Sequence, residues 1–215
     1  MFKKMFKRIS FLAILVLITA GCAAPAAEKV KDTSIIDEWK SVATPPAPEL
    51  KPVSVNPKST ALLILDIQNN SCSQEQRPRC AASIPKIIQL LDRARETGMP
   101  VVYSITTSAS PSDIVTQLAP GKEDLVVKSS VDKFYKTDLG KILQDKGVKT
   151  VVIVGTAAHG AVLHTATAAS VRGFQVIFPV DSIKADTPYA EQYTTWHMLN
   201  SPGTRNRVTL TKAKF

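Results

Sequence analysis

The stretch "VVIVGTAAHGAVLHTAT", residues 151–167, decides the fold of this chain. The four β-branched apolar residues at its start predict a strand that is buried on both faces. The Gly/Ala-rich turn that follows opens a predicted helix, and many α/β hydrolytic enzymes hold their nucleophile at such a strand-to-helix turn. This turn contains His159 and several small residues but no cysteine, so the sequence leaves open whether it is a working site.

Apolar runs of the same kind recur after Pro57. They are rich in β-branched residues and lack polar alternation, so each predicts a buried strand. Between them, apolar residues recur at helical spacing and stop before a glycine, Gly98 in one segment and Gly147 in another. The predicted strands cover residues 61–65, 101–105, 125–127, 150–154, 174–178 and 208–210.

This alternation of strands and helices predicts an α/β fold. We expect three layers, in which a six-stranded, mostly parallel, Rossmann-like sheet carries helices on both faces. Ligands of such sheets bind beyond the carboxyl ends of the strands, so the residues directly after each run are the candidate site residues.

The N-terminus predicts export. A basic segment, "MFKKMFKRIS", precedes ten apolar residues, "FLAILVLITA", which have the length of a secretory signal and are too short to span a bilayer. Residues 1–21 are therefore a predicted signal peptide, residues 22–57 a Pro/Ala-rich linker, and residues 58–215 the folded domain. Within the linker, Ile35, Ile36 and Trp39 could form an apolar stripe that docks on the domain.

The residues "TAGC" before and at Cys22 resemble the lipobox of bacterial lipoproteins, in which the cysteine is lipidated. Thr19 stands where a lipobox usually has leucine. The interpretation is a lipid anchor at Cys22 that tethers the domain to a membrane, facing the periplasm or the cell exterior. The alternative is an ordinary cleaved signal with a free Cys22.

Charge does not indicate a nucleic-acid partner. The formal net charge is +9, but four of the basic residues lie in the first ten positions, and the other 23 are scattered among 18 acidic residues. No dense basic run with interleaved aromatic residues occurs, so we expect no nucleic-acid binding.

Cys72 and Cys80 lie in one polar segment, "NNSCSQEQRPRC", and are close enough in sequence to close a short ring. In an oxidising compartment we expect them to form a disulfide. The alternative, half of a metal site, lacks a nearby histidine or further cysteine.

Charged residues follow two of the apolar runs at the predicted ends of strands. Asp66 comes directly after the run 61–65, and Lys128 after the run 125–127. If these strands lie near the strand that precedes the turn, the carboxylate and the ammonium face amides of that turn, among them those of Ala157 and Gly160. This is a candidate acid/base pair with an oxyanion-stabilising backbone. Asp66 could instead cap the next segment.

Four ordered motifs resemble the isochorismatase-like hydrolases, also called cysteine hydrolases. The resemblance covers residues 58–215 and implies the six-stranded α/β fold. In the amide-cleaving members the motif's Asp, Lys and Cys form a catalytic triad, which the resemblance places at Asp66, Lys128 and Ala161. The motifs are "TALLILDIQNN", "VVKSSVDKFYKTDL", "VVIVGTAAHGAVLHTATAASVRGFQVIFPVDSI" and "WHMLN".

Ala161 excludes the thiol mechanism, because a methyl group cannot attack an amide carbonyl. At the turn the sequence is more similar to the isochorismatases proper, which also carry Ala-His at the places of Ala158 and His159 and no thiol at that of Ala161. Those enzymes cleave a vinyl ether: the Asp protonates the enol carbon, and water captures the oxocarbenium ion. This demands a raised pKa of Asp66, which burial would favour and Lys128 would oppose.

Other candidate residues have two interpretations each. Gln68 lines the pocket or begins a loop, and His159 takes part in the chemistry or hydrogen-bonds within the turn. The nicotinamidases of the family bind a metal through Asp and His, but residues 101–113 contain no His, so we expect no metal and no cofactor.

The sequence therefore predicts an exported, lipid-anchored hydrolase with an Asp/Lys site that acts on a small molecule, with vinyl-ether hydrolysis as the reaction. The rival is a binding module that kept the fold and lost catalysis. A third hypothesis is that the domain mainly self-associates as a homo-oligomer.

Overall fold

The predicted runs form the strands of one parallel sheet in the computed structural model, which describes residues 32–214. The strand order is β3-β2-β1-β4-β5-β7, and the short strand β6 pairs with β4. β6 is too short to be recognised from its sequence. The strands are β1 (Thr60–Leu65), β2 (Val101–Ile105), β3 (Leu125–Lys128), β4 (Thr150–Thr156), β5 (Gln175–Pro179), β6 (Ile183–Lys184) and β7 (Val208–Thr211).

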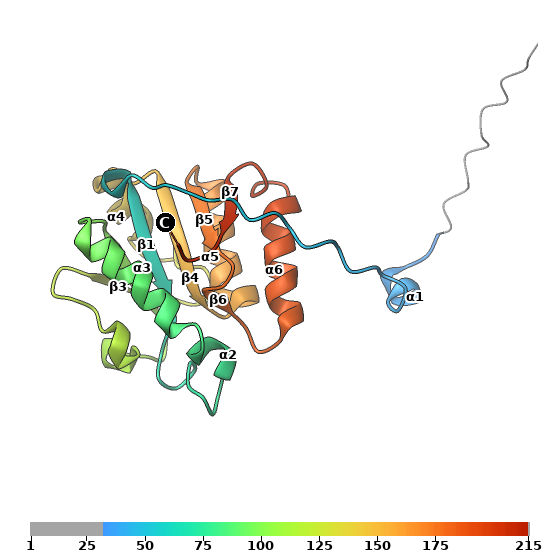
Figure 1. Ribbon diagram of the computed structural model, residues 1–215, viewed down its shortest axis with the longest axis horizontal. Helices are drawn as coiled ribbons and strands as arrows, with labels where there is room; N and C mark the ends of the chain where they lie inside the picture. The colour runs from blue at the N-terminus through green and yellow to red at the C-terminus, as the bar shows by residue number, and fades with distance from the viewer. Residues whose placement is uncertain (1–31, 215) are drawn as a thin grey trace, which may run out of the picture. The chain divides into compact units, whose positions relative to one another are not determined.

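Helices cover both faces of this sheet, as predicted (Figure 1). One apolar core lies between the sheet and α4 (Leu139–Asp145), α5 (Leu163–Val171) and α6 (Pro188–Asn200). The other lies under α3 (Ile84–Glu96) and contains both cysteines of the segment 72–80. Shorter helical segments are α1 (Ile35–Glu38), α2 (Pro78–Ala81), η1 (Pro57–Ser59), η2 (Pro111–Asp113), η3 (Thr116–Leu118) and the π-type turn η4 (Ala158–Val162).

The chain divides into two compact units between Thr44 and Pro45. In the first unit, the predicted stripe forms α1, whose apolar side chains are exposed. The predicted signal peptide and the predicted lipidation site, Cys22, lie outside the described residues. Within residues 32–214, no helix is long and apolar enough to span a membrane.

Residues 45–57 belong to the folded unit and are not a free linker, which corrects the expected boundary at residue 58. The Lys51 N–H donates a hydrogen bond to the carbonyl of Leu210 on β7, at 2.9 Å. Leu50 packs against one core, and Val53 and Val55 pack against the other. Prolines prevent a regular helix here, but an extended chain can still bury apolar side chains and satisfy its amides.

The strand order reverses direction between β1 and β4, which are neighbours in the sheet although β2 and β3 lie between them in the sequence. A crevice forms at such a switch point, at the carboxyl ends of the strands. Asp66 follows β1 and the turn at residues 157–162 follows β4, so the fold brings these two segments to one place.

Gly155 allows the two strands to approach there. Its φ is +127°, and a Cβ at this position would lie 2.1 Å from the carbonyl oxygen of Leu65. Backbone atoms cannot yield to such an overlap, so only glycine fits.

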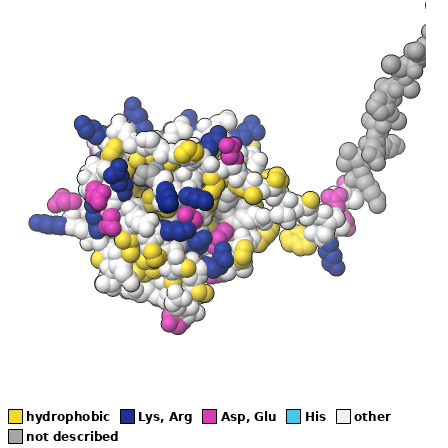
Figure 2. Space-filling view, viewed as in Figure 1, with side chains coloured by type: hydrophobic (Ala, Val, Ile, Leu, Met, Phe, Trp, Pro, Cys, Tyr) yellow, Lys and Arg dark blue, Asp and Glu magenta, His cyan; other side chains and the backbone are white. Residues whose placement is uncertain are grey.

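On the face shown in Figure 2, basic side chains are interspersed with acidic ones, and apolar patches lie between them. The positive charge of the chain is thus not gathered into one uniform field on this face.

We predict that Gly155→Ala lowers the free energy of unfolding by roughly 3–5 kcal/mol, because it adds a backbone clash to an unfavourable φ. Gly173→Ala is the matched control, since Gly173 has φ +96° but no atom within 4 Å of its added Cβ. It should cost only about 1–2 kcal/mol. Urea unfolding of the two variants measures both values, and equal losses would contradict the role given to close strand approach.

Candidate active site

Asp66 is held in one orientation by its backbone and two partners. It is the first residue after β1 and has φ +53°, a left-handed conformation that Asp tolerates better than most residues. The residue is 7% exposed. Its Oδ1 accepts a hydrogen bond from the Ser104 hydroxyl at 2.8 Å, and its Oδ2 lies 2.8 Å from the Lys133 Nζ.

Lys133 is the cation of this site, and its side chain is fully buried. Its Nζ also donates to the carbonyl of Ser129 at 3.1 Å. Its backbone N–H donates to the hydroxyl of Thr165 on α5 at 3.2 Å, which fixes the loop after β3 against the helix after the turn. A lysine without solvent contact requires such partners, because an isolated buried charge is very costly.

The prediction that Lys128 lies beside Asp66 is therefore wrong, because Lys133 is the lysine that pairs with Asp66. Lys128 is the last residue of β3 and is exposed, and β3 is the edge strand, separated from β1 by β2. The ends of β1, β3 and β4 do not converge as expected. The chain has to continue through five more residues before a lysine lies beside Asp66.

Burial dominates the protonation of Asp66. Desolvation raises the pKa of this carboxyl above its ordinary value, while the Coulombic and hydrogen-bonding effects of Lys133 and the hydrogen bond from Ser104 oppose it. The direction of this pKa shift is the one that an acid role of Asp66 requires. A carboxyl in this environment can hold a proton and deliver it.

The turn after β4 is tightly closed on itself. The Thr156–Ala157 peptide bond is cis, and the Ala157 carbonyl accepts hydrogen bonds from the N–H groups of Gly160 at 2.9 Å and Val162 at 3.3 Å. The amide of Gly160 is thus occupied, contrary to its expected part in an oxyanion-binding turn. Ala161 is 4% exposed, whereas His159 is exposed and Ala157 half-buried.

Gln68 connects the loops that follow β1 and β2. Its side chain is buried, and its Oε1 accepts a hydrogen bond from the backbone N–H of Thr106 at 2.9 Å. Its backbone forms an antiparallel bridge with Ile114. These contacts hold the loops that follow β1 and β2 together, and the two interpretations of Gln68 drawn from the sequence stay predictions.

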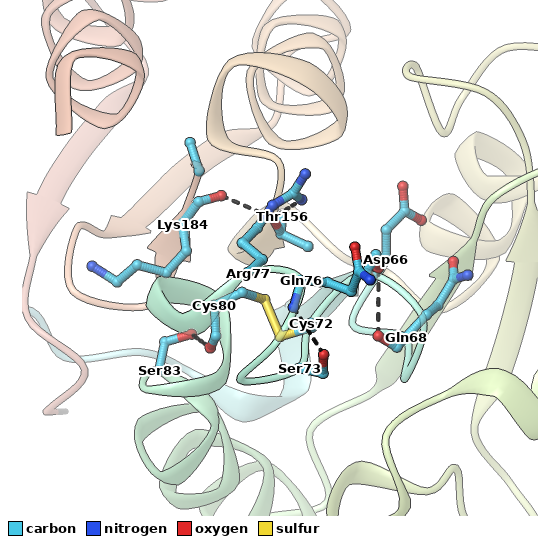
Figure 3. The surroundings of a disulfide bond; sticks show 12 residues. Asp66, Gln68, Cys72, Ser73, Gln76, Arg77, Cys80, Ser83, Thr156 and Lys184 are labelled. Carbon is cyan, nitrogen blue, oxygen red and sulfur yellow. Dashed lines mark hydrogen bonds between the residues drawn. A yellow bond between two sulfur atoms is a disulfide. The ribbon is translucent and has the colours of Figure 1, made fainter. Parts of the chain in front are cut away.

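Cys72 and Cys80 form a disulfide, which closes a loop that we call the cross-linked loop (residues 72–80). Figure 3 shows Arg77 leaving this loop and reaching Thr156 at the end of β4. Its Nη1 donates to the Thr156 hydroxyl at 2.8 Å, and its Nε donates to Asp186 Oδ1 at 2.6 Å.

Three residues of this site were not predicted from the sequence. Ser104 is an ordinary small residue within an apolar strand, and Lys133 is one of several lysines in a polar segment without periodicity. Arg77 lies in a stretch whose only signal was its cysteines. The motif "VVKSSVDKFYKTDL" contains Lys133, so the resemblance marked the right segment but the wrong lysine.

The arrangement unites a buried, protonatable carboxyl, a buried ammonium and a turn without a thiol. It can deliver a proton from Asp66 and then stabilise the resulting carboxylate through Lys133 and Ser104. Within residues 32–214, no group of three or more His, Cys, Asp or Glu side chains could hold a metal ion.

Comparisons with known proteins agree with this fold and motif order. The model of the isochorismatase domain matches residues 60–211. The secreted isochorismatase effector Isc1 of Verticillium dahliae is 29% identical over 144 residues, 61% of this chain and 76% of that protein. Nicotinamidase 3 of Arabidopsis thaliana is 25% identical over 151 residues, 59% of this chain and 74% of that protein.

A solved structure, that of an isochorismatase family protein from Desulfovibrio vulgaris, is similar with a TM-score of 0.65 at 21% identity. The likeness covers 72% of this chain and 94% of that chain, and it concerns the fold. The relatives named for an activity, such as the nicotinamidase and a streptothricin hydrolase, are hydrolases.

We predict that Lys133→Met raises the pKa of Asp66 further, because it removes the cation 2.8 Å from Oδ2 and leaves the carboxyl buried. Lys128→Met, which removes an exposed charge, should leave that pKa unchanged. Titration of the Asp66 side-chain carboxyl by NMR in both variants measures this. Equal shifts, or a shift in Lys128→Met alone, would restore Lys128 as the partner.

We also predict that the mature, denatured, non-reduced protein has no titratable thiol from Cys72 or Cys80. Because the disulfide closes a short loop, its reduction should lower the free energy of unfolding by about 2–3 kcal/mol. The double variant Cys72→Ser/Cys80→Ser is the control, since a reductant should not change its stability. Two free thiols beyond Cys22 would disprove the bridge.

Proposed function

Because the chain belongs to the isochorismatase family, we propose that it is an exported hydrolase that cleaves a vinyl ether on a small molecule without a cysteine nucleophile. The observation that carries the proposal is the buried pair of Asp66 and Lys133 beside a turn with alanine at position 161. In this proposal Asp66 is the proton donor, and the methyl group of Ala161 cannot form a thioester.

In the proposed reaction, protonated Asp66 delivers its proton to the terminal enol carbon of the substrate. The C=C π electrons form the new C–H bond, and the ether oxygen shares the positive charge of the resulting oxocarbenium ion. Water then adds to the cationic carbon and loses a proton, and the hemiketal breaks its C–O bond. The products are an alcohol and a ketone, which is pyruvate when the enol carries a carboxylate.

Lys133 and Ser104 act after Asp66 has given up its proton. When Asp66 becomes a carboxylate, the ammonium at 2.8 Å and the hydroxyl at 2.8 Å stabilise the charge that burial disfavours. These partners are already in place before the reaction, so no reorganisation is needed when the charge appears.

The export part of the proposal rests on the N-terminal sequence. A basic segment, ten apolar residues and a lipobox-like "TAGC" precede the domain. One relative, the effector Isc1, is named as secreted. We propose that Cys22 carries a lipid anchor and that the domain faces the periplasm or the cell exterior.

A binding module without catalysis is the second candidate. Two features of the turn favour it: Ala161 has no reactive group, and the Gly160 amide donates to Ala157 instead of facing a ligand. A module of this kind would bind its small molecule in the same crevice and release it unchanged.

The test is product release by the full-length chain on a panel of vinyl ethers and amides, with pyruvate and ammonia as readouts. We expect pyruvate from a vinyl ether, and we expect Asp66→Asn to lower kcat by about 100-fold or more while the protein stays folded. Because Asp66 must be protonated, the rate should be highest at low pH and fall as the pH rises through its raised pKa.

Ammonia release, or unchanged turnover in Asp66→Asn, would overturn the acid mechanism. Ligand binding without turnover across the panel would support the binding module.

A further inference from the structure

We propose that Arg77, presented by the cross-linked loop, binds a carboxylate of the substrate and thereby restricts this site to anionic molecules. This inference deepens the proposed function and rests on it. It names the chemical class of the ligand from a residue that the proposed reaction does not use.

The first argument is the place of Arg77 relative to Asp66. In the register of β1 and β4, Leu65 pairs with Gly155, so Asp66 and Thr156 are the next residues on the two strands. Neighbouring strands lie about 4.8 Å apart. The guanidinium of Arg77 bonds to the Thr156 hydroxyl, and it therefore lies at the carboxyl end of β4, next to the strand that Asp66 follows.

The second argument is donor capacity. An arginine has five N–H donors, and three hydrogen bonds of Arg77 are described: one to Thr156 and two to Asp186. Two N–H groups are left for a ligand. The fork geometry of a guanidinium matches a carboxylate better than a lysine ammonium does.

The third argument is that a ligand can displace Asp186, the present ion-pair partner of Arg77. The side chain of Asp186 is 58% exposed, and ion pairs with an exposed partner contribute little net stability. A substrate carboxylate in the crevice can share or replace this partner at small cost.

The cross-linked loop explains why Arg77 can be placed there accurately. The disulfide is buried in the core under α3, and Arg79 on the same loop is paired with Glu191 of α6 at 2.7 Å. A loop fixed at both ends loses less conformational entropy when Arg77 engages a ligand.

The experiment measures binding, so it is independent of turnover. Full-length Asp66→Asn protein is titrated with pyruvate, and with methyl pyruvate as the uncharged isostere, by ligand-observed NMR. We expect pyruvate to bind more tightly than its ester. Adding Arg77→Gln should weaken pyruvate binding at least about tenfold and remove the preference. Arg77→Lys should restore part of it.

Arg79→Gln is the matched control, because it removes the other ion pair of the same loop and leaves Arg77 unchanged. It should bind pyruvate like the parent. Equal weakening in Arg79→Gln would mean that loop integrity, not contact with Arg77, governs binding, and would overturn the assignment. So would parent protein that binds both compounds equally or does not bind pyruvate at millimolar concentration.

If the unchanged chain turns over no vinyl ether but binds pyruvate in an Arg77-dependent way, the proposed reaction is contradicted and this inference stands. If the chain turns over vinyl ethers and Arg77→Gln does so equally well, the proposed reaction stands and this inference is contradicted.

Discussion

The buried ion pair between Asp66 and Lys133 is the constraint around which the site is organised. Two charges without solvent are stable only if each has further partners, and those partners come from distant segments. Ser104 comes from β2, and Ser129 and Thr165 fix Lys133 from the loop after β3 and from α5. The pair thus links four segments that surround the carboxyl ends of β1 and β4.

The alanine at position 161, and not this pair, distinguishes the chain from the thiol-dependent members of its family. With alanine at position 161, a carboxylate that only activates a cysteine would have no partner to activate. In the proposed reaction Asp66, whose pKa burial raises, acts as an acid instead. In the turn after β4, the Ala157 carbonyl accepts hydrogen bonds from the amides of Gly160 and Val162, so these two amides already have partners within the turn.

Most of the fold could be predicted because buried parallel strands have a simple signature. The six long strands agree with the predicted runs to within two residues at either end. Asp66 could be predicted for the same reason, since a charge directly after an apolar run is conspicuous. Lys133 could not, because its burial depends on how the loop after an edge strand folds back, and nothing in the local pattern encodes that path.

Residues 45–57 were predicted to be a linker because of their composition, but they pack on the folded domain. The prolines of this segment indicate correctly that it forms no helix or central strand, but composition does not say whether an extended chain packs. In the structure the Lys51 N–H of this segment donates a hydrogen bond to the carbonyl of Leu210 on β7, the edge strand at this end of the sheet. Its apolar residues complete both cores.

This packing has a consequence for solubility. An uncovered edge strand offers unpaired amides and carbonyls to any other extended chain, and is a common starting point for aggregation. The segment at residues 45–57 partly shields that edge of the sheet at β7, and its prolines cannot recruit a further strand in turn. The stretch that resembles a mere spacer thereby disfavours pairing of another chain with the β7 edge.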